Sequence, residues 1–517
     1  MQSSRVRTTA ARHVVAAVCL GALATTSATD AAQPHPNFLF ILTEDQGAQL
    51  GFVGTPGVET PHMDSIANQG VYFAEAFVNY PVCSASKANI YTGLHSHANG
   101  IATNTVNYFK PDSELSEDQR TNGFYQRLRV PDDTPTLVEL LKKQGYFTGV
   151  SDKLHVAPNS KFPYDRWDRV ATGDKVEQFA GEATAEGRPW FYFCNIEQPH
   201  RPFRNGDEVK LTVERTKVEV PAFLPDTPEV RQDWAEYLDA VERADEHVGD
   251  VLAGLERSGQ AGQTIVIFMG DHGPAFHRGK MSPYDFGLRV PLAVRGPGVQ
   301  QGVVSDELVS EIDLMPTILQ YAGIEVPNGL HGQSLLPLLD GVSTSLPGRE
   351  TVVGEVTHGL HAGAVVMEER AIYDGRYRLI YRSDIDGRRD FNADLQYWVT
   401  PGDGNAPWHN RSFDSVVANR EEHPEAYRLL DETCSELGEF QPAELELYDV
   451  QADPYEVNNL ADDPDSAGVR TRLLRALIKH AADTSDAAIT PAKLTSLIKA
   501  GERPVAAANA GRKADSR

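Results

Sequence analysis

Cysteine is scarce in this chain of 517 residues, which contains four. Cys19 lies near the N-terminus, and the other three are Cys83, Cys194 and Cys434. Three cysteines cannot all pair within one chain, and a chain of this length can bury a core without disulfides. A disulfide-dependent fold is therefore excluded, while a bridge between Cys194 and Cys434 stays open.

Positive charge and long apolar runs are also lacking. The chain has 48 Lys and Arg against 73 Asp and Glu, a formal net charge of −25. Because such a chain repels a phosphate backbone, we expect no nucleic-acid partner, and an anionic substrate would need cations within its own site. No run reaches the roughly 18 apolar residues that cross a bilayer, so we expect no membrane span.

The N-terminus has the pattern of a secretory signal peptide. Arg5, Arg7 and Arg12 precede the almost wholly apolar residues 14–24, and small residues follow. This order predicts a cleavable signal over residues 1–32 and a secreted or periplasmic protein, or a lysosomal one in a eukaryotic host. The alternative is a cytosolic chain that begins with a short apolar helix.

Three apolar runs have the character of buried parallel strands. Residues 37–42, 190–196 and 264–269 are continuous apolar stretches, and polar residues follow each of them. Helical patterns lie between the runs, at 137–144 and at about 228–258. Strands that alternate with helices indicate an α/β fold, and ligands of such sheets bind at the carboxyl ends of the strands.

The pattern changes near residue 345. A third helical pattern ends before it, at residues 310–321, and short strands follow it, with a hairpin signal over residues 370–381. We therefore predict a catalytic domain at 33–345 and a smaller C-terminal α+β domain at 346–485, with an antiparallel sheet and a helix. Residues 486–517 are small, polar and charged, and we expect a disordered tail there.

Two pairs of metal-capable residues follow predicted strands. Glu44 and Asp45 follow the first strand, and Asp271 and His272 follow the third. One such pair could simply cap a turn. Two pairs at the same edge of a sheet favour a metal site, and carboxylate oxygens suit Ca²⁺ or Mg²⁺.

Residues 73–78 are a strand-like run, and soon after it Cys83 opens a predicted helix, where unpaired N–H groups and the helix dipole favour an anion. The alternative is an ordinary buried cysteine. Other polar groups are expected at the same edge of the sheet. They are candidates to hold a tetrahedral oxyanion or to transfer protons: Lys153, His155, His200 and Lys280.

Together these motifs resemble the type I sulfatases of the alkaline-phosphatase superfamily. The run C-S-A-S-K at 83–87 is similar to their formylglycine signature C-x-P-x-R. The pairs at 44–45 and 271–272 match their two pairs of metal ligands. Residues 447–449, L-Y-D, match a C-terminal signature. Within the family the chain resembles the N-sulfoglucosamine sulfohydrolases, through H-x-N-G at 97–100 and P-H-R at 199–201.

The resemblance implies an alkaline-phosphatase-like fold, with a central mixed, mostly parallel sheet between helices. It also implies a sulfatase that removes sulfate ester or N-sulfate groups from sulfated saccharides. Cys83 would be oxidised to formylglycine by a maturation enzyme, and its hydrate would attack sulfur beside a bound Ca²⁺, or Mg²⁺. The implied metal ligands are Glu44, Asp45, Cys83, Asp271 and His272.

The resemblance also assigns roles to the other polar residues. Lys153 and Lys280 would neutralise the sulfuryl oxygens, His200 would protonate the leaving group, and His155 would deprotonate the second hydroxyl of the hydrate. The implied catalytic set is Cys83, Lys87, Lys153, His155, His200 and Lys280.

The chain departs from the family pattern at three positions. Ala85 stands where the signature has proline, and Lys87 stands where it has arginine. Both changes bear on the maturation of Cys83, since lysine and arginine are not interchangeable at a forked contact. Glu44 replaces an aspartate and lengthens one metal ligand by a methylene.

Two other functions fit the same residues. One is a phosphodiesterase or phosphonate monoester hydrolase on the same fold, and the other is a non-catalytic protein that binds sulfated glycans. Sugar contacts are expected from the smaller domain. Its polar and aromatic candidates, most of which are more simply explained as packing residues, are His358, His361, Arg382 and Trp398.

Overall fold

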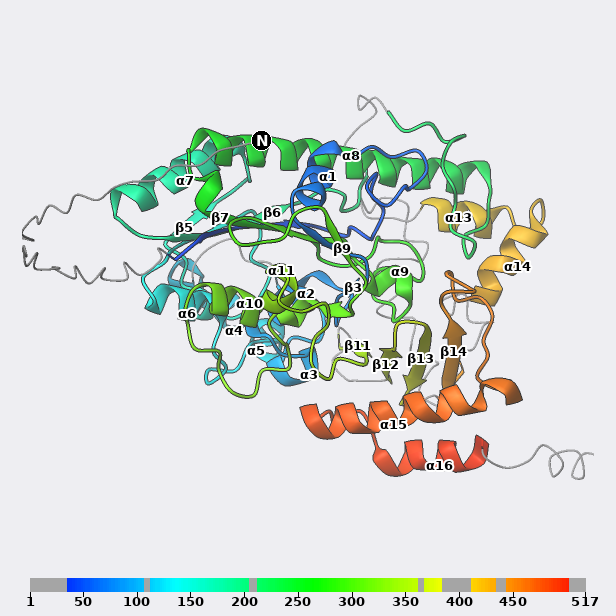
Figure 1. Cartoon of the computed structure of the whole chain (residues 1–517). Helices are drawn as coiled ribbons and strands as arrows, with labels where there is room; N and C mark the ends of the chain where they lie inside the picture. Colours follow the sequence, from blue (N-terminus) through cyan, green and yellow to red (C-terminus); the bar gives the residue numbers. More distant parts are fainter. Residues whose placement is uncertain are drawn as a thin grey trace, which may run out of the picture. The chain divides into compact units, whose positions relative to one another are not determined.

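The first predicted strand lies inside an eight-stranded sheet in the computed structural model of the chain (Figure 1). β1 (Asn37–Thr43) pairs in parallel with β6 (Trp190–Ile196) on one side and with β7 (Thr264–Gly270) on the other. The strand order is β5-β4-β6-β1-β7-β8-β2-β9. The structure describes residues 35–106, 112–203, 212–360, 367–383, 411–433 and 443–501.

The sheet is mixed but mostly parallel. Only β8 is antiparallel to its two neighbours, β7 and β2. The remaining strands are β2 (Val71–Phe73), β4 (Phe147–Ser151), β5 (Arg166–Asp168), β8 (Leu292–Arg295) and β9 (Val303–Ser305). This arrangement confirms the predicted α/β class.

Alternate residues of β1 belong to two different hydrophobic cores. Phe38 and Phe40 pack in the core on one face of the sheet, while Leu39 and Ile41 pack in the core on the other. Because side chains alternate along a strand, a strand that is covered on both faces is apolar throughout. This is the physical origin of the continuous apolar runs in the sequence.

Helices cover both faces of the sheet (Figure 1). α1 (Pro61–Asn68), α7 (Gly173–Ala185) and the second half of α8 (Pro228–Arg257) contribute to one core. The other core contains α2 (Cys83–Thr92), α6 (Leu137–Lys143) and α10 (Leu314–Tyr321). The shorter helices are α3 (Ser96–Asn99), α4 (Glu117–Thr121), α5 (Gly123–Arg127), α9 (Asp285–Leu288), α11 (Leu336–Leu339), α13 (Arg411–Ala418) and α14 (Pro424–Thr433).

A second, antiparallel sheet follows residue 345, as predicted. Its order is β11-β12-β13-β14, with bounds Val352–His358, Met367–Tyr373, Tyr377–Arg382 and Leu445–Asp449. The hairpin expected over residues 370–381 is the β12–β13 pair. α15 (Ala467–Thr484) and α16 (Pro491–Gly501) share a hydrophobic core with this sheet.

Residues 486–501 differ from the disordered tail that the sequence predicts. They include helix α16, whose Leu494 is fully buried and whose Ile498 is 7% exposed. The polar composition of the segment hides these two apolar residues, which lie four positions apart and therefore share one helix face. Residues 502–517 lie outside the described residues, as do the predicted signal over 1–32 and Cys434.

Two predicted elements are divided in the structure. Residues 73–78 belong to two short strands, because β2 ends at Phe73 and β3 (Ala76–Phe77) pairs with β10 (Val309–Ser310). The predicted helix over 310–321 begins as the 3₁₀ turn η4 (Glu311–Asp313) before α10. No helix within the described ranges is long and apolar enough to cross a membrane.

Candidate functional site

Cys83 is the first residue of α2, a helix whose ten residues are all buried. The helix begins after Val82, which is extended, and ends at Gly93, which adopts a left-handed conformation that glycine takes without strain. Cys83 is 1% exposed. The sequence thus places a thiol at the N-terminal end of an interior helix, where backbone N–H groups favour negative charge.

The two pairs of metal-capable residues follow adjacent parallel strands. β1 and β7 pair directly, with Thr43 beside Gly270, so the residues after each strand leave the sheet together. The backbone N–H of Asp45 donates to Oδ1 of Asp271 at 2.7 Å. The sheet register therefore brings Asp45 and Asp271 into contact across 226 residues of sequence.

Four metal-capable side chains converge at this edge. One ligand atom from each of Asp45, Cys83, Asp271 and His272 lies within 4.8 Å of the others. Nε2 of His272 is 3.3 Å from Asp45 Oδ1 and 3.6 Å from Asp271 Oδ1. Its Nδ1 lies 2.8 Å from the carbonyl oxygen of Gly273, a contact that points Nε2 towards the carboxylates.

This donor set fits a divalent cation. Two carboxylates and a correctly oriented imidazole are ordinary ligands, and all three side chains are fully buried or nearly so. Glu44, the remaining predicted ligand, is not a member of the converging set. Its carboxylate pairs instead with Lys87 and, at 2.5 Å, with Lys153.

Three lysines balance the acidic groups: Lys87 and Lys280 are buried, and Lys153 is 11% exposed at the side chain. Lys87 contacts both Glu44 and, at 3.4 Å, Asp271. Nζ of Lys280 lies 2.8 and 3.0 Å from the two oxygens of Asp45 and 3.4 Å from Sγ of Cys83. Every predicted lysine of the site therefore contacts a predicted acidic residue.

Burial and the neighbouring charges shift the pKa values of the thiol and of the carboxyl groups. Burial opposes ionisation of Cys83, but the ammonium groups of Lys280 and Lys153 hold the pKa of its thiol below its ordinary value. In the same way, Lys153 and Lys87 outweigh burial and hold the pKa of Glu44 well below its usual range. Burial instead raises the pKa of Asp271 to about 8, with the charge of Glu44 adding to it.

Two histidines border the cluster. His155 follows β4 with a φ of 54°, and its Nε2 lies 3.0 Å from the carbonyl oxygen of Thr105. Its buried Nδ1 has no hydrogen-bond partner among the described residues. Burial, then the charges of Lys153 and Lys87, hold the pKa of His155 well below its ordinary value, so the ring is neutral at pH 7.

His200 lies close to Asp45. Its Nε2 is 3.9 Å from Asp45 Oδ2, and its Nδ1 is 2.5 Å from the carbonyl oxygen of Arg201. Burial lowers the pKa of His200 to about 4, against the opposing charge of Asp45. The side chain is 19% exposed, so one edge of the site reaches solvent.

Glu311 supports the site and does not stand out in the sequence. Its carboxylate accepts hydrogen bonds from Ser86 Oγ at 2.7 Å, Asn89 Nδ2 at 2.8 Å and the Asn79 N–H at 2.8 Å. It therefore anchors the first two turns of α2. A charged residue at the start of an otherwise apolar helical pattern was the available signal.

The proposed sugar contacts have other partners where the structure describes them. His358 pairs with Glu369 at 3.0 Å, and Arg382 is held between Glu369 at 2.5 Å and Glu446 at 2.7 Å. Both are almost completely buried, so packing explains them. His361 and Trp398 lie outside the described residues.

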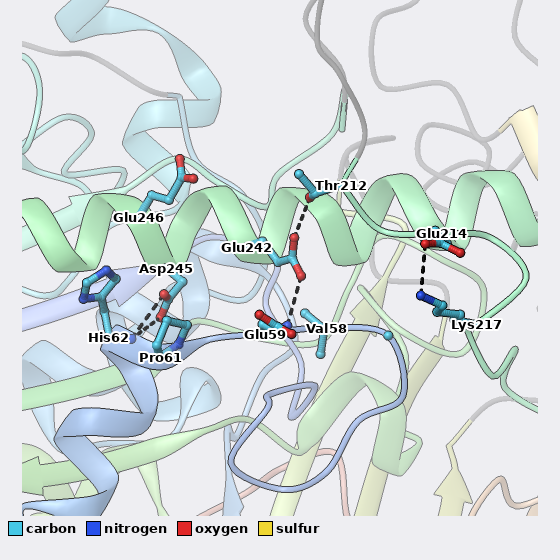
Figure 2. A pocket seen from close by; sticks show the side chains of 11 residues that line it. Val58, Glu59, Pro61, His62, Thr212, Glu214, Lys217, Glu242, Asp245 and Glu246 are labelled. Atoms are coloured by element: carbon cyan, nitrogen blue, oxygen red, sulfur yellow. Dashed lines mark hydrogen bonds and ion pairs between the residues drawn. The ribbon is translucent and has the colours of Figure 1, made fainter.

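A hollow of about 620 Å³ opens elsewhere, between α8 and the segment before α1 (Figure 2). None of its lining residues belongs to the predicted site. Figure 2 shows two of its carboxylates accepting hydrogen bonds: Asp245 from the N–H of His62, and Glu242 from the Thr212 hydroxyl and the Glu59 N–H. Its acidic lining would repel a sulfate, so the hollow is not a site for an anionic substrate.

Comparison with known proteins identifies the family. The sulfatase family model matches residues 36–324, and the model of the C-terminal part of N-sulphoglucosamine sulphohydrolase matches residues 270–395. The chain therefore belongs to the sulfatase family, a family of hydrolases, and the predicted similarity to N-sulfoglucosamine sulfohydrolases is confirmed.

The alignments with two related proteins cover most of the chain. It is 29% identical to human N-sulphoglucosamine sulphohydrolase over 496 residues, which cover 87% of this chain and 90% of that protein. It is 26% identical to an ulvan-active sulfatase of Formosa agariphila over 462 residues, 86% of this chain and 80% of that one.

Solved structures share the fold at low sequence identity. A Bacteroides thetaiotaomicron structure, from work on the metabolism of multiple glycosaminoglycans, gives a TM-score of 0.64 at 18% identity. It covers 91% of this chain and 100% of that one. A phosphonate monoester hydrolase from Silicibacter pomeroyi gives a TM-score of 0.59 at 19% identity, covering 88% and 97%. The predicted fold is therefore confirmed.

Proposed function

We propose that this protein hydrolyses sulfate ester or N-sulfate groups of sulfated sugars, including glycosaminoglycan-like polysaccharides. The observation that carries the proposal is the position of Cys83, whose Sγ lies 3.3 Å from His272 Nε2 and 3.4 Å from Lys280 Nζ. The names of the human and Formosa relatives, a sulphohydrolase of N-sulphoglucosamine and an ulvan-active sulfatase, support a sulfated saccharide as the substrate.

We further propose that Cys83 is converted to formylglycine and that Asp45, Asp271 and His272 hold a Ca²⁺ ion together with residue 83. Glu44, the other predicted ligand, has its carboxylate paired with Lys87 and Lys153 in the structure. When present, the hydrated aldehyde supplies a hydroxyl nucleophile and the ion neutralises sulfuryl oxygens.

The lysines orient the sulfate group. Lys280 and Lys153 present ammonium groups at the edge of the cluster, where they can bind the oxygens of a tetrahedral sulfuryl group. Lys87, with no exposed surface, holds Glu44 and Asp271 in place. These cations supply the local positive charge that an acidic protein needs to bind an anion.

The histidines move protons. His155 is neutral, and its Nδ1 has no hydrogen-bond partner in the described part of the chain, so it can accept a proton from residue 83. The Nδ1 proton of His200 is held by the carbonyl of Arg201, which leaves Nε2 to face the site. A bound anionic substrate favours protonation of Nε2, and His200 then donates that proton to the departing oxygen or nitrogen.

Mass spectrometry of the peptide that contains residue 83, together with substrate turnover, tests the proposal. We expect formylglycine at position 83 and release of sulfate from N-sulfoglucosamine or a nitrophenyl sulfate. Cys83→Ala should abolish turnover without lowering the melting temperature by more than a few degrees. Active protein that contains only the unmodified thiol would disprove the formylglycine part.

A nitrophenyl phosphate diester and an immobilised sulfated glycan complete the assay. A clear preference for the diester would replace the sulfatase with a phosphodiesterase or phosphonate hydrolase. Glycan binding without any turnover, and with an unmodified Cys83, would instead indicate the non-catalytic binding protein.

A further inference from the structure

Four histidines gather around one buried glutamate, beyond the C-terminal end of α2. The ring of His95 lies 4.8 Å from that of His480, 5.3 Å from that of His331 and 5.6 Å from that of His97, centroid to centroid. Glu355, on β11, is 1% exposed at the side chain and contacts His95 and His97. The group joins the α3 segment, β11 and α15, which are far apart in sequence.

Three of these side chains present ligand atoms to a common point. Single ligand atoms of His95, Glu355 and His480 all lie within 4.8 Å of one another. Nδ1 of His95 is 3.2 Å from Oε1 of Glu355, a spacing that is normal for two ligands of one ion. Nε2 of His480 is buried and has no hydrogen-bond partner among the described residues.

We propose that His95, Glu355 and His480 form a second metal site, which binds Zn²⁺. Two imidazoles and one carboxylate are a ligand set of zinc, with water in the fourth position of a tetrahedron. Imidazole ligands favour zinc and its transition-metal neighbours over Ca²⁺ or Mg²⁺, which take oxygen ligands. The site therefore differs in its chemistry from the oxygen-rich cluster at Cys83.

The remaining histidines orient the ligands. Nδ1 of His97 lies 2.5 Å from Oε1 of Glu355, and the backbone N–H of His97 donates to Oε2 at 3.2 Å. Nδ1 of His331 accepts a hydrogen bond from the backbone N–H of His95 at 3.2 Å. Such contacts behind the ligands fix their direction, as is usual for metal sites.

The guanidinium group of Arg370, which lies near the proposed metal site, donates its hydrogen bonds elsewhere. Arg370 is fully buried near Glu355, but its Nε and one terminal nitrogen donate to Asp486 at 2.6 and 2.9 Å. Its other terminal nitrogen donates to the carbonyl oxygen of Glu369 at 2.9 Å. These hydrogen bonds of Arg370 thus go to Asp486 and Glu369, while the carboxylate of Glu355 contacts His95 and His97.

The site is separate from the candidate active site. Cys83 begins α2 and His95 follows its C-terminal end, so the helix alone sets them about 15 Å apart at 1.5 Å per residue. A zinc ion here would fasten α15 to the segment after α2 and stabilise the folded chain. The proposal does not depend on the proposed sulfatase activity.

Metal content and thermal unfolding of the full-length protein test the site, with Zn²⁺ alone as the probe. We expect one equivalent of tightly held zinc and a higher melting temperature after zinc is added. His480→Gln should lose both the equivalent and the shift. His423→Gln, which alters an exposed histidine on another part of the chain, should keep both.

Anomalous diffraction at the zinc edge gives a second test that needs no variant. We expect a peak between His95, Glu355 and His480. No peak there, or zinc only beside residue 83, would overturn the proposal, as would equal zinc content in wild type and His480→Gln. Loss of zinc together with normal sulfate release would leave the proposed function intact, so the two proposals can fail separately.

Discussion

At the scale of single residues, Lys87 shows how the site accommodates a departure from its family pattern. The family signature has arginine here, yet the lysine is fully buried and its single ammonium contacts both Glu44 and Asp271. A compact charge can bridge two carboxylates without the fork of a guanidinium. The substitution therefore preserves the charge balance, although the geometry of the contact differs.

We expect Lys87→Met to destabilise the protein strongly. The change leaves Glu44 and Asp271 buried with less compensating charge, which costs about 3–5 kcal/mol when one partner of a buried ion pair is removed. Urea unfolding measures this difference. Lys217→Met is the matched control, because Lys217 is 66% exposed and pairs on the surface with Glu214; its effect should stay within about 0.5 kcal/mol. Equal midpoints for the two variants would contradict the expectation.

At the scale of elements, α2 is held by a residue from another part of the chain. Glu311 lies in the turn η4 and receives hydrogen bonds from Ser86 and Asn89 of α2. Burial raises the pKa of Glu311 to about 8, against the hydrogen bonds that favour its charged form. The position of Cys83 is thus linked to a carboxyl that is protonated more readily in the folded chain.

This shift predicts a dependence of stability on pH. A carboxyl whose folded pKa lies above its ordinary value of 4.5 favours folding at low pH, and that contribution is lost as the pH rises through 4.5 towards about 8. Glutamine cannot titrate. The melting temperature of the wild type relative to Glu311→Gln should therefore fall between about pH 5 and pH 8 and level off above it. A difference that is constant with pH would show that Glu311 does not titrate in this window.

The elements also show where local sequence patterns are sufficient. The helical pattern over residues 137–144 and the hairpin signal over residues 370–381 each lie within a few residues, and α6 and the β12–β13 hairpin form as predicted. Residues 73–78 read as one strand but are divided, because Val71–Phe73 and Ala76–Phe77 join different sheets. Pairing partners that lie far along the chain decided that division.

At the scale of the whole molecule, a net charge of −25 opposes the approach of a polyanion. The lysines of the site are paired with carboxylates, so the net negative charge dominates the field at long range. Salt screens that repulsion beyond a Debye length, which is about 8 Å at physiological ionic strength. Association and catalysis therefore respond differently to salt.

We expect kcat/KM for a multiply sulfated oligosaccharide to rise about two- to fivefold as ionic strength increases from roughly 0.01 to 0.15 M, because salt screens long-range repulsion. A nitrophenyl monosulfate, with one charge, is the control and should change less. Steady-state assays at fixed pH measure both. A fall in kcat/KM for the oligosaccharide would show that local cations dominate the approach as well.

The sequence by itself determined the α/β class, both sheets and the family, because these depend on periodicity along the chain and on short motifs in a fixed order. It also predicted the residues that gather around Cys83, because the carboxyl ends of parallel strands lie at one edge of the sheet. Only the tertiary structure decided that Glu44 faces lysines while Asp45 faces the metal-capable cluster, that Glu311 anchors α2, and that His95, Glu355 and His480 meet. Those contacts join residues that lie tens to hundreds of positions apart, and no local pattern encodes which distant side chains packing will bring together.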